Sequence, residues 1–176
     1  GAVWLDPEKT SPYSFYQFWL NVDDEAAKDY LKYFTLLSIS EIGELILKFD
    51  GDKAGRLAQK TLAYEVTKLV HGEEKANSIA KVSEVLFGEG SFLDLSEKEK
   101  ALLAEDLPTI APANDPYDTV VLAGLAKSKT EARNFHAAGA IYINGDKVAA
   151  EQPITFRKGT NLIRRGKNSF ALVVKD

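Results

Sequence analysis

The sequence contains no cysteine and no methionine among its 176 residues, and its apolar runs are short. Without cysteine the chain can form neither disulfide bonds nor thiolate metal sites. No apolar run approaches the roughly 18 residues that a membrane-spanning helix requires. The first residues, GAVWLDPEKTS, lack a basic segment followed by an apolar core, so we expect no signal peptide there. Together these absences predict a cytoplasmic location.

Positive charge is scarce in the first part of the chain and concentrated in the last part. The net charge of the whole is −4, but from Tyr117 onward ten Lys and Arg stand against five Asp and Glu, a net of +5. Residues 1–116 carry 12 basic against 21 acidic residues, a net of −9. Such asymmetry indicates a nucleic acid or another anionic surface as partner of the basic part. Two solvated surfaces of different charge would give the same totals, so both interpretations stay open.

The stretch from residue 11 to residue 105 has the pattern of consecutive helices. Ser38 with Glu41, and Ser96 with Glu99, have the spacing of a capping box, in which both side chains satisfy N–H groups at a helix start. Apolar residues recur at helical spacing, and no segment alternates cleanly with the period of two that a strand needs. We therefore predict an all-helical domain over residues 1–107.

Three of the six prolines fall within PTIAPANDP, residues 108–116. Proline fits neither a helix interior nor a paired strand, so this segment predicts an extended linker and a domain boundary. Residues 117–176 combine two helix patterns with short strand patterns around Asn144-Gly145, the strongest short signal for a β-hairpin. The predicted fold class is a mostly α helical domain followed by a small α+β domain over residues 117–176.

Residues 128–148, SKTEARNFHAAGAIYINGDKV, combine a cap, a basic helix and this hairpin. If Ser128 caps the helix, a rotation of about 100° per residue places Lys129, Arg133 and His136 in one stripe. We expect that stripe to face outward and the opposite, apolar face to pack on the strands. The amino end of the helix adds partial positive charge and free N–H groups, which suit phosphate oxygens.

A second basic group lies in the RRGKN loop and comprises Arg164, Arg165 and Lys167, which we expect beside Arg157 and Lys158. Helix and loop together predict a positive surface on this small α+β domain that follows a phosphate backbone. An exposed helix that is merely well solvated is the alternative.

The stretch 128–148 resembles an RNA-binding module first described in a protein of the small ribosomal subunit. That module reads as a Ser-Lys-x-Glu-Ala-Arg helix, then glycine, then a Val-x-Val-Asn-Gly hairpin. The chain matches it at nine positions: Ser128, Lys129, Glu131, Ala132, Arg133, Gly139, Ile143, Asn144 and Gly145. It departs at Asn134, where members often carry a second arginine, so one phosphate contact is missing there.

Two further stretches, AVWLDPEKTSPYSFYQFWLNVDDEAAKDYLKYFT and NLIRRGKNSFALVV, resemble bacterial-type tyrosyl-tRNA synthetases. In that family the first stretch follows the catalytic lysine loop and leads into a helical anticodon-binding domain. The resemblance implies the carboxy-terminal half of an ATP-dependent aminoacyl-tRNA ligase, whose parent uses ATP and Mg²⁺. The two adenylate-forming motifs of the family are absent, and we identify no glycine-rich phosphate loop or catalytic triad. We therefore expect no catalytic residue, metal site or cofactor in these residues.

By this resemblance the partners are tyrosine tRNA and the catalytic domain of the same polypeptide, with the chain itself a monomer and the parent a homodimer. The candidates for holding the anticodon stem and the long variable arm, through phosphate and 2′-hydroxyl groups, are Lys127, Lys129, Arg133, His136, Arg157, Lys158, Arg164, Arg165 and Lys167. Asp24 in the NVDDE turn is the candidate reader of an anticodon guanine, because a carboxylate accepts from the N1 and N2 hydrogens. Asp24 could also cap a helix.

Two other functions remain open. The RNA-binding module occurs in many proteins, so the chain could belong to a ribosome-associated or RNA-modifying protein, although TSPYSFYQFWLN is then unexplained. A helical protein-interaction scaffold without an RNA role would instead bind a protein without salt sensitivity and would show no affinity for tRNA.

Overall fold

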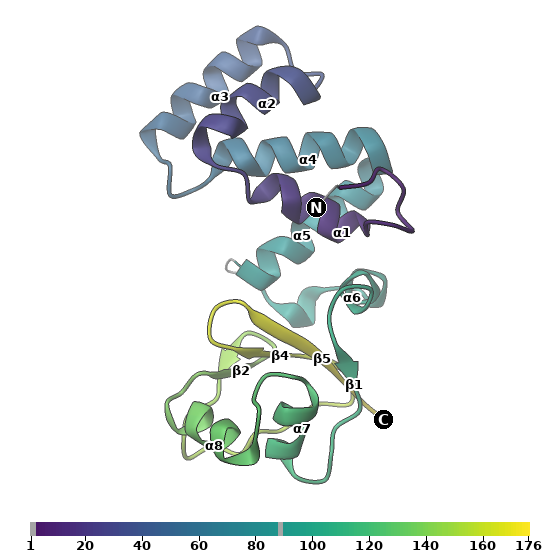
Figure 1. The fold of residues 1–176 in the computed structure, drawn as a ribbon, viewed down its shortest axis with the longest axis vertical. Coiled ribbons are helices and arrows are strands. Elements are labelled where there is room, and N and C mark those ends of the chain that lie inside the picture. The colour runs from purple at the N-terminus through teal and green to yellow at the C-terminus, as the bar shows by residue number, and fades with distance from the viewer. Residues whose placement is uncertain (1–2, 88–89) are drawn as a thin grey trace. The chain divides into compact units, whose positions relative to one another are not determined.

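The computed structural model describes residues 3–87 and 90–176, and the chain forms two compact units, one up to Ala80 and one from Lys81 onward (Figure 1). The division falls within a helix, α5 (Glu73–Phe87), and not in the proline-rich segment. The division into functional domains at residues 107 and 117 stays a prediction. No helix within the described residues is long and apolar enough to cross a membrane.

The first unit contains helices and no strand among its described residues, 3–80, as the sequence predicted. Its elements are α1 (Pro12–Leu20), α2 (Asp24–Phe34), α3 (Ile39–Gly51), α4 (Leu57–His71) and the first part of α5. Asp23 caps α2 by accepting from the N–H of Ala26, and Ser38 and Glu41 form the predicted capping box of α3. Local capping chemistry therefore sets where these helices begin.

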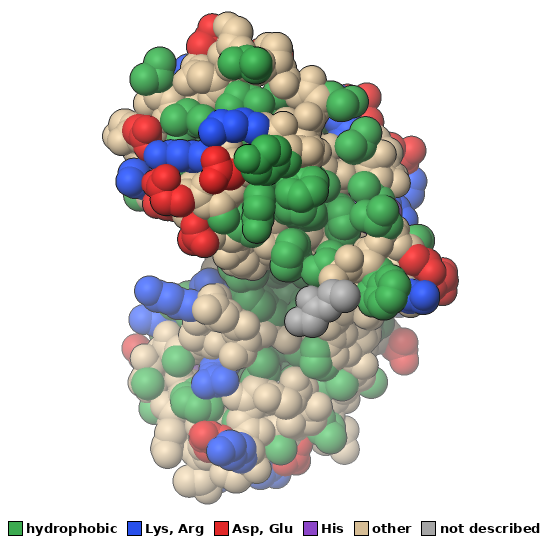
Figure 2. All heavy atoms as spheres, turned by 45° about the horizontal axis from the view of Figure 1, so that its top comes forward, with side chains coloured by type: hydrophobic (Ala, Val, Ile, Leu, Met, Phe, Trp, Pro, Cys, Tyr) green, Lys and Arg blue, Asp and Glu red, His purple; other side chains and the backbone are tan. Residues whose placement is uncertain are grey.

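The core of the first unit is formed by side chains from α1 to α4. Phe15, Leu31, Phe49 and Leu62 are fully buried there, and each such burial contributes about 1.5–3 kcal/mol. Other apolar side chains of this unit stay at the surface, with Ile39 exposed to 91%. Figure 2 shows hydrophobic side chains gathered in its upper half. A surface of this kind is typical of a region that packs against another protein part.

The second unit is a small α+β structure, which confirms the predicted fold class. Its helical elements are the end of α5, a 3₁₀ turn η1 (Phe92–Asp94), α6 (Glu97–Ala104), α7 (Pro116–Leu122) and α8 (Lys129–Ala137). Its strands are β1 (Thr109–Ile110), β2 (Ile141–Ile143), β3 (Asp146–Lys147), β4 (Gly159–Arg165) and β5 (Ser169–Lys175).

The five strands form one sheet in the order β1-β5-β4-β2-β3. β1 runs parallel to β5, and the other neighbouring strands are antiparallel. Ile163 of β4 lies opposite Ile143 of β2 and Ala171 of β5. Because successive side chains of a strand point to opposite faces, Ile163 and Arg165 share one face of the sheet, while Arg164 points to the other.

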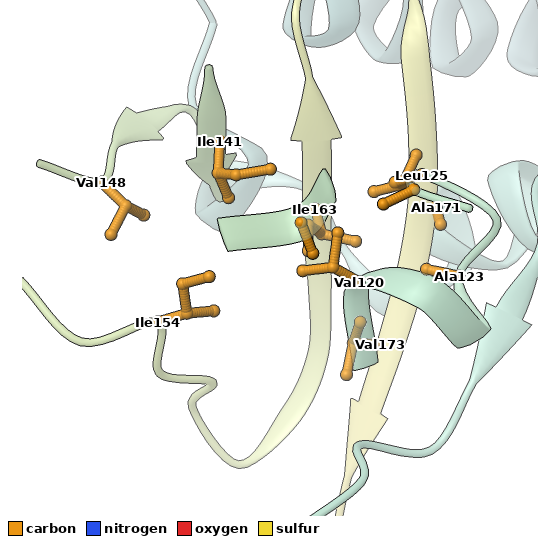
Figure 3. Close-up of a cluster of buried hydrophobic side chains, with 11 residues drawn as sticks. Val120, Ala123, Leu125, Ile141, Val148, Ile154, Ile163, Ala171 and Val173 are labelled. Carbon is orange, nitrogen blue, oxygen red and sulfur yellow. The ribbon is translucent and has the colours of Figure 1, made fainter. Parts of the chain in front are cut away.

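The helices α7 and α8 belong to the core on the face of the sheet that carries Ile163. Figure 3 shows the side chains of Val120 from α7 and Ile163 from β4 close together, with Ile141 and Ala171 from the neighbouring strands. All four are fully buried. Burial of these side chains helps to fix α7 and α8 against the sheet. Residues 117–176 are called the module below.

The opposite face of the sheet is covered near β5 by residues that precede the sheet in the chain. Phe170 of β5 contacts Phe87 of α5 edge to face, with 5.4 Å between the ring centroids. Leu162 and Leu172 on this face are also buried. The sheet is therefore apolar on both faces toward β5.

Asn144 and Gly145 form the turn between β2 and β3, as predicted. Their φ angles are +54° and +100°, a left-handed backbone that favours asparagine and glycine. The buried Asn144 side chain accepts through Oδ1 from the N–H of Leu162 at 2.8 Å and donates through Nδ2 to Asn161 Oδ1 at 3.1 Å. These bonds attach the hairpin to β4.

The proline-rich segment 108–116 differs from the expectation at its start. Thr109 and Ile110 pair with β5 as the parallel strand β1, and the N–H of Leu172 donates to the Pro108 carbonyl at 2.8 Å. The two paired residues lie between the prolines and keep their own N–H groups, so proline does not prevent the pairing. This part of the segment is an edge of the sheet, and the expectation of a linker without strand pairing was wrong there.

Candidate nucleic-acid interface

The helix α8 begins at the serine that the sequence indicates. Ser128 Oγ accepts from the N–H of Glu131 at 3.2 Å, while the Glu131 carboxylate accepts from the N–H of Lys127 and not from that of Ser128. In a capping box the glutamate would accept from the N–H of the cap residue Ser128, whereas here it accepts from the N–H of the preceding residue. At the other end Gly139, with φ of +64°, turns the chain from α8 toward β2.

Lys129 lies in the first turn of α8, and its charge is already neutralised. Its Nζ lies 2.8 Å from Asp118 Oδ2 and 3.0 Å from Asp115 Oδ2. Hydrogen bonds to Asp118 and Asp115 raise the pKa of Lys129, and the hydrogen bond with Lys129 lowers the pKa of Asp115. The expectation that this lysine points freely outward is corrected, because two carboxylates at the start of α7 face it.

His136 was also expected on the outward stripe, and that expectation was wrong because its side chain is buried, with 4% exposed. Its Nε2 lies 2.9 Å from the carbonyl oxygen of Ala149, which only accepts, so Nε2 carries a proton. Its Nδ1 lies 3.0 Å from Tyr117 Oη and accepts the hydroxyl proton when the ring is neutral. Both ring nitrogens are therefore used inside the module, and the stripe that holds His136 faces α7.

Two cations at α8 keep their charges available. Lys127 and Arg133 are exposed, and neither makes an ion pair within the described part of the chain. The Arg133 guanidinium carbon lies 5.3 Å from the centroid of the Tyr117 ring, which is a cation–π contact. Arg133 is thus held near α7 by a contact that leaves its N–H donors free for phosphate oxygens.

Arg164 and Arg165 follow each other on β4 and point to opposite faces of the sheet. Arg165 lies on the α8 face, where its guanidinium carbon is 4.9 Å from the Phe135 ring centroid and its Nη2 donates to Ser169 Oγ at 3.1 Å. Its Nε is buried and has no hydrogen-bond partner. Arg165 therefore helps to hold α8 on the sheet, while Arg164 is turned away from that core.

The RRGKN turn meets the carboxyl end of α8. The N–H of Gly166 donates to the Ala140 carbonyl at 2.9 Å, which places the exposed Lys167 near the exit of the helix. Arg157 and Lys158 precede β4, at the opposite end of a strand of seven residues. At about 3.3 Å per residue this strand separates the two basic groups by roughly 20 Å. The expectation that they lie beside each other was wrong, because β4 runs between them.

Asp24 is the first residue of α2 and is not its cap, since that role falls to Asp23. The Oδ1 atom of Asp24 accepts from Gln59 Nε2 of α4 at 2.8 Å. Gln59 is 1% exposed, so this bond fixes the direction of a partly exposed carboxylate.

Tyr142 of β2 is a residue that sequence reasoning missed. The Arg164 guanidinium carbon lies 3.9 Å from the centroid of its ring. The period-two alternation of AIYI together with the hairpin signal at Asn144-Gly145 could have placed this tyrosine on the face opposite the core, but not across from Arg164.

The described residues contain no group of three or more His, Cys, Asp or Glu side chains that could hold a metal ion. The residues at α8 and in the RRGKN turn offer cations and N–H donors, which bind polyanions. None of the described residues is assigned to ATP or Mg²⁺.

Comparisons with known proteins give consistent matches over most of the chain. Residues 1–88 match the family of class I tRNA synthetases (W and Y), and residues 99–173 match the tyrosine–tRNA ligase SYY-like C-terminal domain. The tyrosine–tRNA ligase of Lactococcus lactis subsp. cremoris (strain SK11) is 45% identical over 175 residues, which cover 94% of this chain and 42% of that protein. Tyrosine–tRNA ligase 1 of Bacillus anthracis is 42% identical over 181 residues, 98% of this chain and 43% of that protein.

Among solved structures, a C-terminally truncated mitochondrial tyrosyl-tRNA synthetase of Aspergillus nidulans is 39% identical with a TM-score of 0.49, over 49% of this chain and 24% of that chain. The chain spans less than half the length of the curated relatives named above.

Proposed function

The chain belongs to the tyrosyl-tRNA synthetase family, and on that premise we propose that these residues are the tRNA-binding portion of a tyrosine–tRNA ligase. The observation that carries the proposal is the set of unpaired cations in the module. Of the ten Lys and Arg from Tyr117 onward, only Lys129 makes an ion pair within the described residues. A cation without a carboxylate partner binds phosphate without first losing an ion pair, so these residues suit an RNA backbone.

The module is proposed to hold the anticodon stem and the long variable arm of tyrosine tRNA. The cations offered to RNA are Lys127 and Arg133 at α8, Lys167 in the RRGKN turn, Arg164 on the sheet face away from α8, and Arg157 and Lys158 at the far end of β4. Arg165 is proposed to add its charge to this set while it also holds α8 on the sheet. Contacts to phosphates and 2′-hydroxyls hold and orient the RNA but do not read its sequence. Lys129 and His136 act within the protein, since they fix α8 against α7.

The helical unit is proposed to read the anticodon through Asp24. Unpaired bases are recognised by hydrogen bonds to their edges, and a carboxylate accepts from the N1 and N2 hydrogens of guanine. The bond from Gln59 Nε2 supports this role, because it holds one oxygen of Asp24 in place. The second oxygen has no hydrogen-bond partner within the described residues and can accept from a base.

For the whole protein we propose ATP-dependent aminoacylation of tyrosine tRNA by an amino-terminal catalytic domain of the same polypeptide, where ATP and Mg²⁺ would bind. The relatives are more than twice as long as the region matched here, which leaves room for such a domain. The exposed apolar side chains of the first unit, such as Ile39, offer a surface for domain packing. We further propose a monomer for these residues alone, a homodimer for the whole enzyme and a cytoplasmic location.

A tRNA titration tests this function. The chain is mixed with tyrosine tRNA, or with the same tRNA lacking its long variable arm, at 50 mM and at 200 mM salt. With 6 to 10 phosphate contacts, affinity should fall by roughly three to five orders of magnitude between these salt concentrations, on the double-helical scale.

Preference for the long arm together with this salt dependence supports the proposal. Absence of binding to both RNAs at 50 mM salt contradicts it, and equal, salt-insensitive binding contradicts it as well. The second result would favour a protein-interaction role, whose affinity does not depend on released counterions.

A further inference from the structure

Arg164 and Tyr142 form the closest cation–ring contact within the described residues, at 3.9 Å from the guanidinium carbon to the ring centroid. The two residues are directly opposite each other on the antiparallel strands β4 and β2. Guanidinium groups stack on aromatic rings because the planar, weakly hydrated cation fits the ring face. The contact therefore fixes the position of a cation on the sheet face that points away from α7 and α8.

The donors of Arg164 are unused. Its side chain makes no hydrogen bond and no ion pair within residues 3–87 and 90–176. A guanidinium carries five N–H donors in a fixed arrangement that matches two oxygens of a phosphate. Arg165, one residue later, instead donates to Ser169 and packs on Phe135. Of the two neighbouring arginines, only Arg164 is both held in place and free to donate.

The neighbours of this pair continue the same row across the sheet. Lys147 of β3 is opposite Tyr142, and Phe170 of β5 is opposite Arg164. Phe170 is covered by Phe87, whereas Lys147 is exposed and makes no ion pair within the described residues. The row thus runs from a covered apolar end to an exposed basic end, and the guanidinium lies between them.

From this arrangement we propose that Tyr142 is a positioning residue that holds Arg164 as a preorganised two-point donor for one phosphate of the bound RNA backbone. An arginine that is already fixed loses little conformational freedom on binding, so more of the contact appears as affinity. Lys147 adds a positive charge beside this row, where its amino end lies against Gly139 at the exit of α8. The inference rests on the proposed function, since it names how one residue of the module meets tRNA.

The test measures tRNA affinity as a function of salt for variants of this row. Arg164→Gln should weaken binding about eightfold at 0.1 M salt, because each phosphate contact adds about 0.9 to log K there. It should also lower the slope of log K against log salt by about 1. Arg164→Lys keeps the charge but offers no two-point contact, so it should bind severalfold more weakly with the slope unchanged.

Tyr142→Leu tests the positioning role. It should weaken tRNA binding about three- to fivefold, because the guanidinium of Arg164 must then be ordered during binding. Tyr142→Phe keeps the aromatic ring and should bind tRNA like the unaltered chain. In the Arg164→Gln background Tyr142→Leu should have no further effect, since its contribution passes through Arg164. Lys28→Gln removes one charge that is already paired with Asp50 in the helical unit, and serves as the matched control.

An unchanged salt slope in Arg164→Gln overturns the phosphate contact. An equal loss from Tyr142→Leu in both backgrounds overturns the positioning role and would indicate that the ring meets a base directly. If the unaltered chain binds tRNA with the expected salt dependence and none of these variants changes the affinity, the inference about Arg164 and Tyr142 is wrong. The proposed function is not affected by that result. If the unaltered chain fails to bind tRNA at all, the proposed function fails and this inference falls with it.

Discussion

The helical unit, residues 1–80, and the module from Tyr117 onward differ in the share of their lysines and arginines that form ion pairs, three of nine against one of ten among the described residues. In the helical unit Lys28, Lys32 and Lys68 each pair with a carboxylate, and Lys28 Nζ lies 2.9 Å from Asp50 Oδ1. Figure 2 shows basic and acidic side chains next to each other in its upper part. From Tyr117 onward only Lys129 is paired within the described residues. Net charge gives the sign of a surface, whereas pairing shows which charges a polyanion can use without displacing a carboxylate.

This difference suggests that the two regions contribute differently to tRNA binding. Unpaired cations hold a phosphate backbone without regard to sequence, so the module would supply most of the affinity. The helical unit, whose surface lysines are partly neutralised, offers instead a carboxylate fixed by a buried glutamine, Asp24 with Gln59. A fixed acceptor of this kind suits base recognition and adds little affinity of its own.

The largest effect is expected from removing two unpaired cations of the module. Arg133→Gln combined with Lys167→Gln should weaken tRNA binding roughly 60-fold at 0.1 M salt, because each phosphate contact adds about 0.9 to log K. The salt slope should fall by about 2. The matched control, Lys28→Gln combined with Lys32→Gln, removes the same charge from lysines that are already paired. Filter binding over a range of salt concentrations measures both.

Equal losses in the two double variants would show that tRNA responds only to net charge, and the contrast between the units would then disappear. A larger loss of tRNA affinity in the Lys28 and Lys32 variant would show that the helical unit supplies most of the phosphate contacts. Melting curves by circular dichroism establish that each variant is folded before its affinity is compared.

A smaller effect is expected for Asp24, because it concerns discrimination between RNAs. Asp24→Ala should reduce the preference for tyrosine tRNA over an anticodon variant by about tenfold, since one good two-point base contact gives about 1–3 kcal/mol of discrimination. Asp23→Ala is the control one residue away, because it removes the α2 cap and costs about 0.5–2 kcal/mol of stability. Competition binding with the two tRNAs gives the ratio directly. Equal losses for both RNAs would exclude Asp24 as a reader.

The features that the sequence predicted well are those set by neighbours along the chain. Caps at Ser38 and Ser128 and the turn at Asn144-Gly145 depend on side chains a few residues away, and the structure confirms them. The order of a helical domain followed by a small α+β domain rests on the same local signals.

The features that sequence missed depend on contacts between distant elements. Helical periodicity placed Lys129, Arg133 and His136 in one stripe, but it could not show that α7 covers this stripe. The pattern of basic residues likewise could not show that β4 separates Arg157 from Arg164. Pairing of Arg164 with Tyr142 required the register between β2 and β4, which no local signal specifies.

The smallest effect is expected from Lys129, the one paired cation of the module among the described residues. Its folded-state pKa is raised above 10.5 by Asp118 and Asp115, and the pKa of Asp115 is lowered below 3.8 mainly by the hydrogen bond with Lys129. A raised lysine pKa gives stability that is present below 10.5 and lost as pH rises through the folded value. A lowered carboxyl pKa gives stability that is present above 3.8 and lost as pH falls through the folded value.

Lys129→Gln should therefore lower the melting temperature slightly between these limits, and the difference from the unaltered chain should vanish in acid as Asp115 becomes protonated. High salt should reduce the difference too, because the pair is partly exposed and screened. Affinity for tRNA should change much less than in Arg133→Gln, since the Lys129 charge is already used by α7. A loss of affinity with the salt slope lowered by about 1 would show that Lys129 leaves its carboxylates to bind phosphate. In that case pairing in the free protein would no longer separate structural cations from RNA-binding ones.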